Sequence, residues 1–187
     1  MSNKLKLTNV RLSFNALFNP ESKFDGEPKF SALLIVDKNT DEGKENLKRV
    51  KEAIKSLEKS DLGGIELPID KLPLQDGNND EGEGKYLGWK DSIIITTGNR
   101  KRPVVVGRQR QPVAEGDQDA PYSGCYVNVI VSPWAMNHAQ YGKRIIFSLE
   151  AVQFAKAGDP FVSSTVDVES DFDVLDVEEV SSSVFDL

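Results

Sequence analysis

The sequence predicts a mainly β domain with one amphipathic helix and an acidic C-terminal tail. Short runs of β-branched and aromatic residues alternate with turn-forming residues through most of the chain. Only residues 41–60 place their apolar side chains at helical spacing. Residues 159–187 contain nine acidic residues and no lysine or arginine. Together these features predict one folded domain, residues 1–158, followed by a disordered tail, residues 159–187.

The first predicted strand, KLKLTNVRLSF, changes phase along its length. Its leucines alternate with lysines, and Val10, Leu12 and Phe14 then follow the opposite phase. This change predicts a bulge, a feature that curves strands into barrels. A loop beginning at Asn19-Pro20 separates it from the second predicted strand, KFSALLIVD at residues 29–37.

Residues 41–60 are the one predicted helix. Its apolar stripe has spacings of three, four and three residues and consists of Leu47, Val50, Ile54 and Leu57. Thr40 or Asp41 can cap the N-terminus, and two glycines follow the C-terminus. The basic residues of this helix are interpreted as a solvated face.

Four further strand regions follow a loop-like stretch at residues 61–91. SIIITT at 92–97 and PVVVG at 103–107 are separated by GNRKR, which predicts a β-hairpin. In YSGCYVNVIVS at 122–132, Cys125 and the valines share the apolar phase, so Tyr122 and Tyr126 are expected on the opposite face. Residues 143–156 are the last predicted strand.

The charge of the chain is unevenly distributed. The net charge is −7, yet residues 1–158 hold 21 acids against 23 basic residues, a net of +2. The chain has one cysteine, no apolar run near the roughly 20 residues that span a bilayer, and no apolar leader segment. We therefore expect an intracellular protein that does not enter a membrane.

The sequence contains no motif that predicts catalysis. The one histidine, His138, lies in a loop without an adjacent partner, and Cys125 falls in the apolar phase of a strand. We expect a protein that is not an enzyme and needs no cofactor or metal. One alternative stays open: a nuclease whose carboxylate site draws on Asp76, Asp80 or Asp117.

Basic and aromatic residues are interleaved in the second half of the chain. Residues 85–110 contain seven Lys or Arg and one acid. Cations follow a phosphate backbone, and aromatic rings offer unpaired bases a stacking surface, a combination that favours single strands over duplex. The predicted DNA-binding residues are Trp89, Arg100, Lys101, Arg102, Arg108, Arg110, Tyr122, Tyr126, Trp134, Lys143 and Arg144.

The same pattern has a structural interpretation. Both tryptophans could belong to the core, and basic loops can protect edge strands from aggregation. From composition alone the two interpretations stand level.

Three segments add a resemblance to a known family. VRLSFNALFNPESKFDGEPKFSALLIVDK, PYSGCYVNVIVSPWA and LEAVQFAKAGDP occur in this order and resemble a family of bacteriophage single-stranded DNA-binding proteins with an OB-fold. The resemblance covers roughly residues 5–160. It implies an OB-fold-like, partly open barrel of five to six strands with a groove for the DNA strand. It also implies a role in DNA replication or recombination in the cytoplasm of an infected bacterial host.

The tail resembles the acidic tails of many phage and bacterial single-strand binders. Its last residues, Phe185, Asp186 and Leu187, are the predicted contact with replication or recombination proteins, and its acids are expected to compete with DNA. A solubility tail is the alternative. A protein-interaction module, such as a recombination mediator or an assembly factor, is the alternative for the whole chain. The sequence leaves open whether the protein forms a homo-oligomer.

Overall fold

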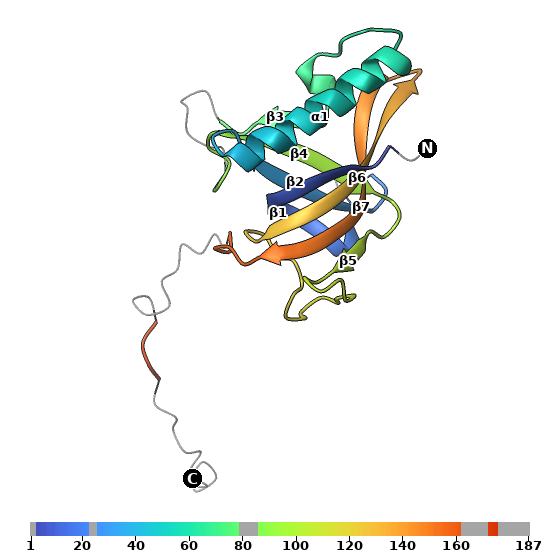
Figure 1. Cartoon of the computed structure of the whole chain (residues 1–187). Coiled ribbons are helices and arrows are strands. Elements are labelled where there is room, and N and C mark those ends of the chain that lie inside the picture. The colour runs from blue at the N-terminus through green and yellow to red at the C-terminus, as the bar shows by residue number, and fades with distance from the viewer. Residues whose placement is uncertain (1–2, 23–25, 79–85, 162–171, 176–187) are drawn as a thin grey trace, which may run out of the picture.

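The computed structural model describes residues 3–22, 26–78, 86–161 and 172–175. Its elements in chain order are β1 (Leu5–Glu21), β2 (Lys29–Asp37), α1 (Asp41–Ser60), the short 3-10 helix η1 (Ile69–Lys71), β3 (Leu74–Asp76), β4 (Ser92–Asn99), β5 (Val104–Val106), β6 (Tyr126–His138) and β7 (Gly142–Lys156). The predicted mainly β fold with one amphipathic helix is confirmed (Figure 1).

Five of the strands in the described part of the chain form a ring. The order is β4-β2-β1-β6-β7, and β7 pairs with β4 to close it. At this seam Gly98 pairs in parallel with Ser148, and the Asn99 side-chain amide donates to the Leu149 carbonyl oxygen at 3.1 Å. β3 and β5 lie outside the ring, on β4 and β7 respectively. The predicted loop-like stretch at 61–91 thus contains η1 and β3.

β1 is bent at two bulges. The first confirms the predicted phase change: the pairing with β6 shifts between Leu7 and Val10, and Asn9 has a φ of 55°. The second was not predicted: the pairing with β2 shifts between Ser13 and Asn15, and Phe14 has a φ of 32°. Because a bulge turns side chains to new directions, Phe14 does not continue the inward phase of Val10 and Leu12 but points outward.

The predicted hairpin between residues 92–97 and 103–107 is wrong. β4 and β5 do not pair with each other; each lies beside β7 instead. Two contacts of Asn99 turn the chain: its amide binds β7, and its Oδ1 accepts from the Lys101 backbone N–H at 3.0 Å. Pro103, which lacks a backbone N–H, precedes β5. The basic residues 100–102 therefore connect two strands that lie one after the other along the same edge of β7, rather than forming a hairpin tip.

α1 packs on the barrel through the predicted stripe. Val50, Ile54 and Leu57 are buried in the main core, and Leu47 packs against it. Thr40 caps the N-terminus, accepting from the Gly43 N–H at 3.0 Å. The helix also meets β1 at its first bulge, where Asn46 binds the Thr8 N–H at 3.1 Å and the Thr8 carbonyl oxygen at 2.8 Å.

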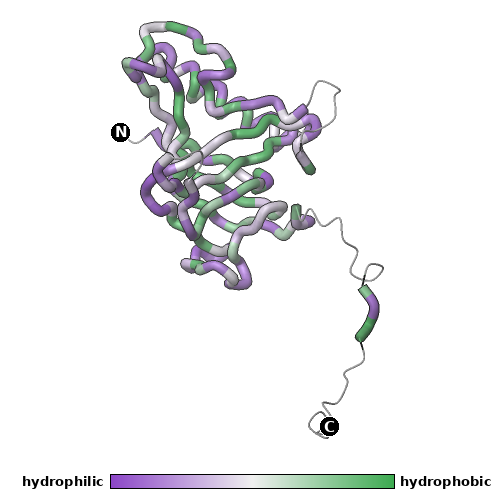
Figure 2. The backbone as a smooth tube through the Cα atoms, turned by 180° about the vertical axis from the view of Figure 1, so that it is seen from behind, coloured by the Kyte–Doolittle hydropathy of each residue, from purple (hydrophilic) through white to green (hydrophobic). Residues whose placement is uncertain are grey.

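Hydrophobic stretches follow the strands, and the connections are largely hydrophilic (Figure 2).

Candidate nucleic-acid interface

The outward side of β1, β2 and β4 forms a continuous surface, which we call the β2 face. Residues directly opposite each other in a sheet share a side. The pairings therefore place three rows of residues on this face, each row running across neighbouring strands. The last row contains Gly98, which lies at the seam with β7. The rows are Arg11, Ile35 and Ile94; Ser13, Leu33 and Thr96; and Ser31 and Gly98.

Three aromatic rings meet on the β2 face. Phe14 lies with its ring centre 5.1 Å from that of Tyr86 and 6.2 Å from that of Trp89, and Tyr86 and Trp89 are 4.7 Å apart. All three pairs are edge-to-face, an arrangement favoured by the ring quadrupoles. We call these residues the aromatic cluster. It joins segments that are distant in sequence, the second bulge of β1 and the connection before β4.

The three rings differ in exposure. Phe14 is 54% exposed and Tyr86 is 45% exposed, whereas Trp89 is 3% exposed. The Trp89 indole N–H donates to Ser13 Oγ at 3.3 Å, and its ring packs with Ile35 and Ile94. The prediction that Trp89 lines the groove as a stacking ring is corrected: its ring has no free face for a base, and it supports Phe14 and Tyr86 instead.

A hollow of about 560 Å³ lies beside the aromatic cluster. The three rings and Leu33 line it, together with polar residues from β1, β2, β3 and the segment before β6: Asn15, Glu21, Ser31, Gln75 and Ser123. Phe14 holds a left-handed backbone conformation that costs roughly 1–3 kcal/mol for a residue other than glycine. Such strain is concentrated at binding and catalytic sites, and here it places a large apolar ring in solvent.

Trp134 extends this surface across the seam. Ser31 pairs with Gly98, Gly98 pairs with Ser148, and the Trp134 indole N–H donates to Ser148 Oγ at 2.9 Å. Adjacent strands are about 4.8 Å apart. Ser31, Gly98 and Ser148 therefore lie side by side on three neighbouring strands, and Trp134 adjoins them. Trp134 is 42% exposed. Its ring is therefore held by a hydrogen bond and still exposed, and its predicted stacking role stays a prediction.

Residues 100–102 lie at the rim of the β2 face, directly after β4. Arg100 is exposed and forms an ion pair with Glu27 at 3.1 Å. The Arg102 guanidinium is 5.4 Å from the ring centre of Phe30, and Lys101 is exposed. Lys143 and Arg144 lie farther along the β6–β7 hairpin, paired with Asn137 and Met136. This hairpin projects from the barrel beside the C-terminal end of α1 (Figure 1).

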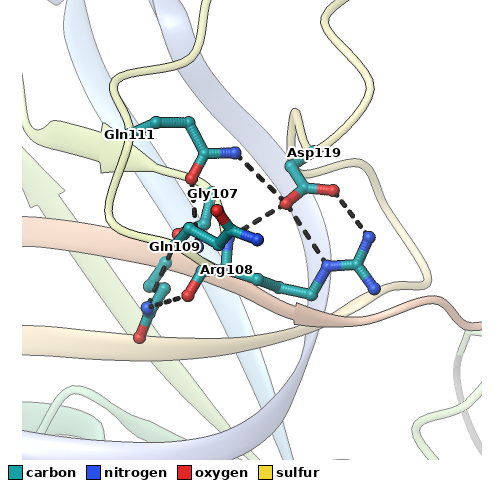
Figure 3. Close-up of polar contacts among 6 residues, drawn as sticks. Gly107, Arg108, Gln109, Gln111 and Asp119 are labelled. Atoms are coloured by element: carbon teal, nitrogen blue, oxygen red, sulfur yellow. Dashed lines mark hydrogen bonds and ion pairs between the residues drawn. The ribbon is translucent and has the colours of Figure 1, made fainter.

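Arg108 is exposed, but its guanidinium is paired with a largely buried carboxylate, Asp119. Its Nη2 donates to Asp119 Oδ1 at 2.9 Å, its Nε to Oδ2 at 3.3 Å, and its backbone N–H to Oδ2 at 3.0 Å (Figure 3). These hydrogen bonds raise the pKa of Arg108 and lower that of Asp119. The predicted groove role of Arg108 stays a prediction, and its guanidinium already has a carboxylate partner within the fold. Arg110, two residues on, is exposed at a φ of 65°.

The two predicted tyrosines do not share a strand face. Tyr122 lies in the turn before β6, half-buried against the core, and its hydroxyl donates to the Gly158 carbonyl oxygen at 2.9 Å and accepts from the Gly158 N–H at 3.2 Å. It therefore has a packing role, and its predicted position in a strand is wrong. Tyr126 begins β6 opposite Arg11, whose guanidinium is 5.7 Å from the tyrosine ring centre, and Lys156 is 4.5 Å from the same centre.

The carboxylates considered for a nuclease site are not gathered. Asp76 pairs with Lys38 at 3.3 Å, and its pKa is lowered mainly by the Asn78 backbone N–H. Asp117 accepts from the Ala114 N–H at 2.7 Å, and Asp80 lies outside the described residues. Residues 3–22, 26–78, 86–161 and 172–175 contain no group of three or more His, Cys, Asp or Glu able to hold a metal ion. Burial raises the pKa of the Cys125 thiol.

Two further predictions concern other parts of the chain. The tail contacts Phe185, Asp186 and Leu187 lie outside the described residues, so the predicted partner site stays a prediction. Within the described part of the chain, no helix is both long and apolar enough to cross a membrane.

The predicted DNA-binding residues omitted three residues of the β2 face, Phe14, Tyr86 and Arg11. Phe14 continues an apolar alternation in the sequence, which predicts an inward position, and the second bulge is visible only in the pairing with β2. In the sequence Arg11 stands between two apolar residues, and only the pairing of β1 with β6 places it beside Tyr126. An isolated cation within a predicted strand is the one signal that could have indicated it.

The five-stranded barrel, its two extra strands and its one helix match the fold of OB-fold-like single-stranded DNA-binding proteins. The family model described as Enterobacter phage Enc34, ssDNA-binding protein, matches residues 3–182. The chain therefore belongs to this family, and the resemblance found in the sequence is confirmed.

Relatives and solved structures agree with this assignment. Putative protein p50 of Acyrthosiphon pisum secondary endosymbiont phage 1 is 33% identical over 184 residues, covering 94% of this chain and 96% of the relative. The single-stranded DNA-binding protein from bacteriophage Enc34 in complex with ssDNA has a TM-score of 0.74 and 28% identity, covering 86% of this chain and 90% of the other. Bacteriophage T7 gp2.5, a single-stranded DNA-binding protein, has a TM-score of 0.57, 10% identity and coverage of 92% and 96%, a likeness of fold alone.

Proposed function

We propose that this protein is a non-catalytic, largely sequence-tolerant single-stranded DNA-binding protein that acts in phage DNA replication or recombination in the host cytoplasm. The observation that carries the proposal is the aromatic cluster, with two exposed rings at a hollow of about 560 Å³ on the β2 face. Aromatic stacking is sequence-tolerant because every base has a π-face. Membership of the Enc34 family supports the same ligand.

The proposed path of the strand crosses the β2 face. Bases stack on Phe14, Tyr86 and Trp134, while phosphates meet the cations at the rim, Lys101 and Arg102 among them. A duplex does not suit this surface, since its bases already stack on one another. The acidic tail competes for the same cations when DNA is absent and, once displaced, contacts replication or recombination proteins through its apolar end.

The test is a titration of fluorescein-labelled oligo-dT followed by anisotropy at several salt concentrations. Two proteins are compared: the full chain, and a chain ending at Phe161 that keeps every contact described for the folded domain. We expect both to bind, with affinity falling linearly in log–log form with salt. The shortened chain should bind more tightly at low salt, because nearby acids are removed, and the difference should shrink as salt screens them.

Each part of the proposal can fail separately. Absence of binding by either protein at low salt would exclude the single-stranded DNA function. Binding of equal strength by both proteins, or weaker binding by the shortened one, would exclude competition by the tail. Equal affinity for duplex of the same length would contradict the stacking mechanism.

A further inference from the structure

The segment at residues 157–161, which we call the strap, lies against the β2 face where the folded domain meets the acidic tail. The Phe161 N–H donates to the Ser123 carbonyl oxygen at 3.1 Å, and the Phe161 ring packs on the cluster of Ile35, Trp89 and Ile94. The strap thus occupies the row of the β2 face next to the aromatic cluster.

Two glycines make room for the strap. Gly88 has a φ of 83°, and a Cβ placed there would lie 2.6 Å from Phe161 Cζ. Gly124 has a φ of 109°, and a Cβ there would collide with the Asp159 carbonyl oxygen. Both positions combine a left-handed backbone with close approach, which other residues tolerate poorly. The strap therefore packs closely into a site formed by Gly88, Gly124 and their neighbours, which we call the seat.

Arg11 is the centre of this seat. Its guanidinium lies 4.2 Å from the ring centre of Phe161 and 5.7 Å from that of Tyr126. Its Nε donates to the Gly124 carbonyl oxygen at 3.0 Å, and its Nη2 donates to the Asp159 carbonyl oxygen at 2.8 Å. Among the described residues no carboxylate forms an ion pair with Arg11. Within that part of the chain, its guanidinium contacts neutral carbonyl groups and ring faces.

We propose that Arg11, Tyr126 and Lys156 form a nucleotide subsite and that the strap occupies it when DNA is absent, with the Phe161 ring standing where a base would stack on Arg11. This inference rests on the proposed function. A phosphate oxygen in place of the Asp159 carbonyl would convert a neutral hydrogen bond to Arg11 into a charge-assisted one, which is about twice as strong. A base in place of Phe161 would keep the stacking contact with the guanidinium.

The surroundings fit a phosphodiester. Lys156 is exposed at the end of β7, 4.5 Å from the Tyr126 ring centre. A second hollow of about 320 Å³ adjoins the seat and is lined by three cations, Arg11, Lys90 and Lys156, and by two acids, Asp37 and Glu42. The subsite continues the β2 face beyond the aromatic cluster, so a bound strand that extends past Trp89 must displace the strap.

The first experiment compares Phe161→Ala with Phe172→Ala in the full chain. Both variants remove one phenyl ring and no charge, but Phe172 is 66% exposed in the tail segment. We expect Phe161→Ala to bind fluorescein-labelled oligo-dT roughly two- to tenfold more tightly than the unaltered chain, with an unchanged salt slope. Phe172→Ala should bind as the unaltered chain does. Unchanged or weaker binding by Phe161→Ala would overturn the subsite.

The second experiment detects displacement of the strap directly, whether or not the DNA affinity changes. 4-Fluorophenylalanine is placed at position 161 or 172, and the ¹⁹F resonance is followed as oligo-dT is added. Displacement of the strap moves the resonance of residue 161 toward that of the exposed residue 172, whereas a resonance unmoved at saturating DNA overturns the proposal. If the unaltered chain binds oligo-dT and residue 161 does not respond, only the subsite fails. If it does not bind at all, the proposed function fails and the subsite with it.

Discussion

Two basic regions of the molecule have similar sequences but differ in their ion-pair partners within the fold. Residues 100–102, RKR, follow β4 at the rim of the β2 face, where Lys101 and Arg102 have no carboxylate partner among the described residues. Residues 108–110, RQR, begin with an arginine bound three times by Asp119. A cation serves a phosphate backbone only if its charge is not already used within the fold. Local density of arginine in a sequence does not distinguish the two cases.

The aromatic residues show the same division. Phe14 and Tyr86 rest on Trp89, Trp134 is held by one hydrogen bond, and all three rings are partly exposed. The rings of Trp89 and Tyr122 instead pack within the fold. The interface therefore combines exposed groups with buried ones that hold them in place. This division sets the order of the expected effects.

The largest effect is expected from the aromatic cluster. Phe14→Ala combined with Tyr86→Ala should weaken oligo-dT binding about thirtyfold or more, because each of the two stacked bases contributes ~1–3 kcal/mol. Anisotropy titration at fixed salt measures the change, and the salt slope should stay the same since no charge is removed. Tyr141→Ala is the matched control: its ring is 59% exposed but lies at the end of the β6–β7 hairpin. Equal weakening in the control and the double variant would show that the β2 face is not the stacking surface.

The next effect separates the two basic regions. Lys101→Ala with Arg102→Ala should lower the salt slope of binding by about 1.4, because each phosphate of a single strand that a cation neutralises adds roughly 0.7 to the slope. Arg108→Ala should leave the slope unchanged and instead lower the thermal stability, because Asp119 is left without its partner. Measuring log affinity against log salt concentration for both variants shows which basic region contacts the phosphates. A shallower slope for Arg108→Ala alone would reverse the assignment.

The sequence predicted the helix, the main strands and the inward phase of β6, because these follow from periodicity and local propensity. Val127, Val129 and Val131 are buried as their alternation requires. It did not predict the direction of Phe14, since a bulge depends on how two strands align and not on either strand alone. The β4–β5 hairpin failed for a related reason: Asn99 binds β7, a strand about 50 residues further on. The partner of Arg108 was equally hidden, because nothing in a sequence joins residue 108 to residue 119.

The smallest effect concerns the Arg108–Asp119 pair and affects stability alone. Hydrogen bonds from Arg108 lower the pKa of Asp119 in the folded protein below its unfolded value of about 3.9. A group with a lowered folded pKa stabilises the fold above its unfolded pKa and loses that contribution as the pH falls through its folded pKa. Asp119→Asn should therefore lower the free energy of unfolding at pH 7, with a difference from the unaltered protein that disappears in strong acid.

Urea denaturation of both proteins between pH 7 and about pH 2 measures this difference. Glu66→Gln removes the same charge from an exposed residue and should leave the free energy of unfolding at pH 7 nearly unchanged. Oligo-dT affinity at pH 7 should also be nearly the same in Asp119→Asn, since Arg108 is expected to act within the fold. If Asp119→Asn instead tightened DNA binding and steepened its salt slope, the freed Arg108 would have joined the interface. The ion pair would then be what keeps this second basic region out of the DNA-binding site.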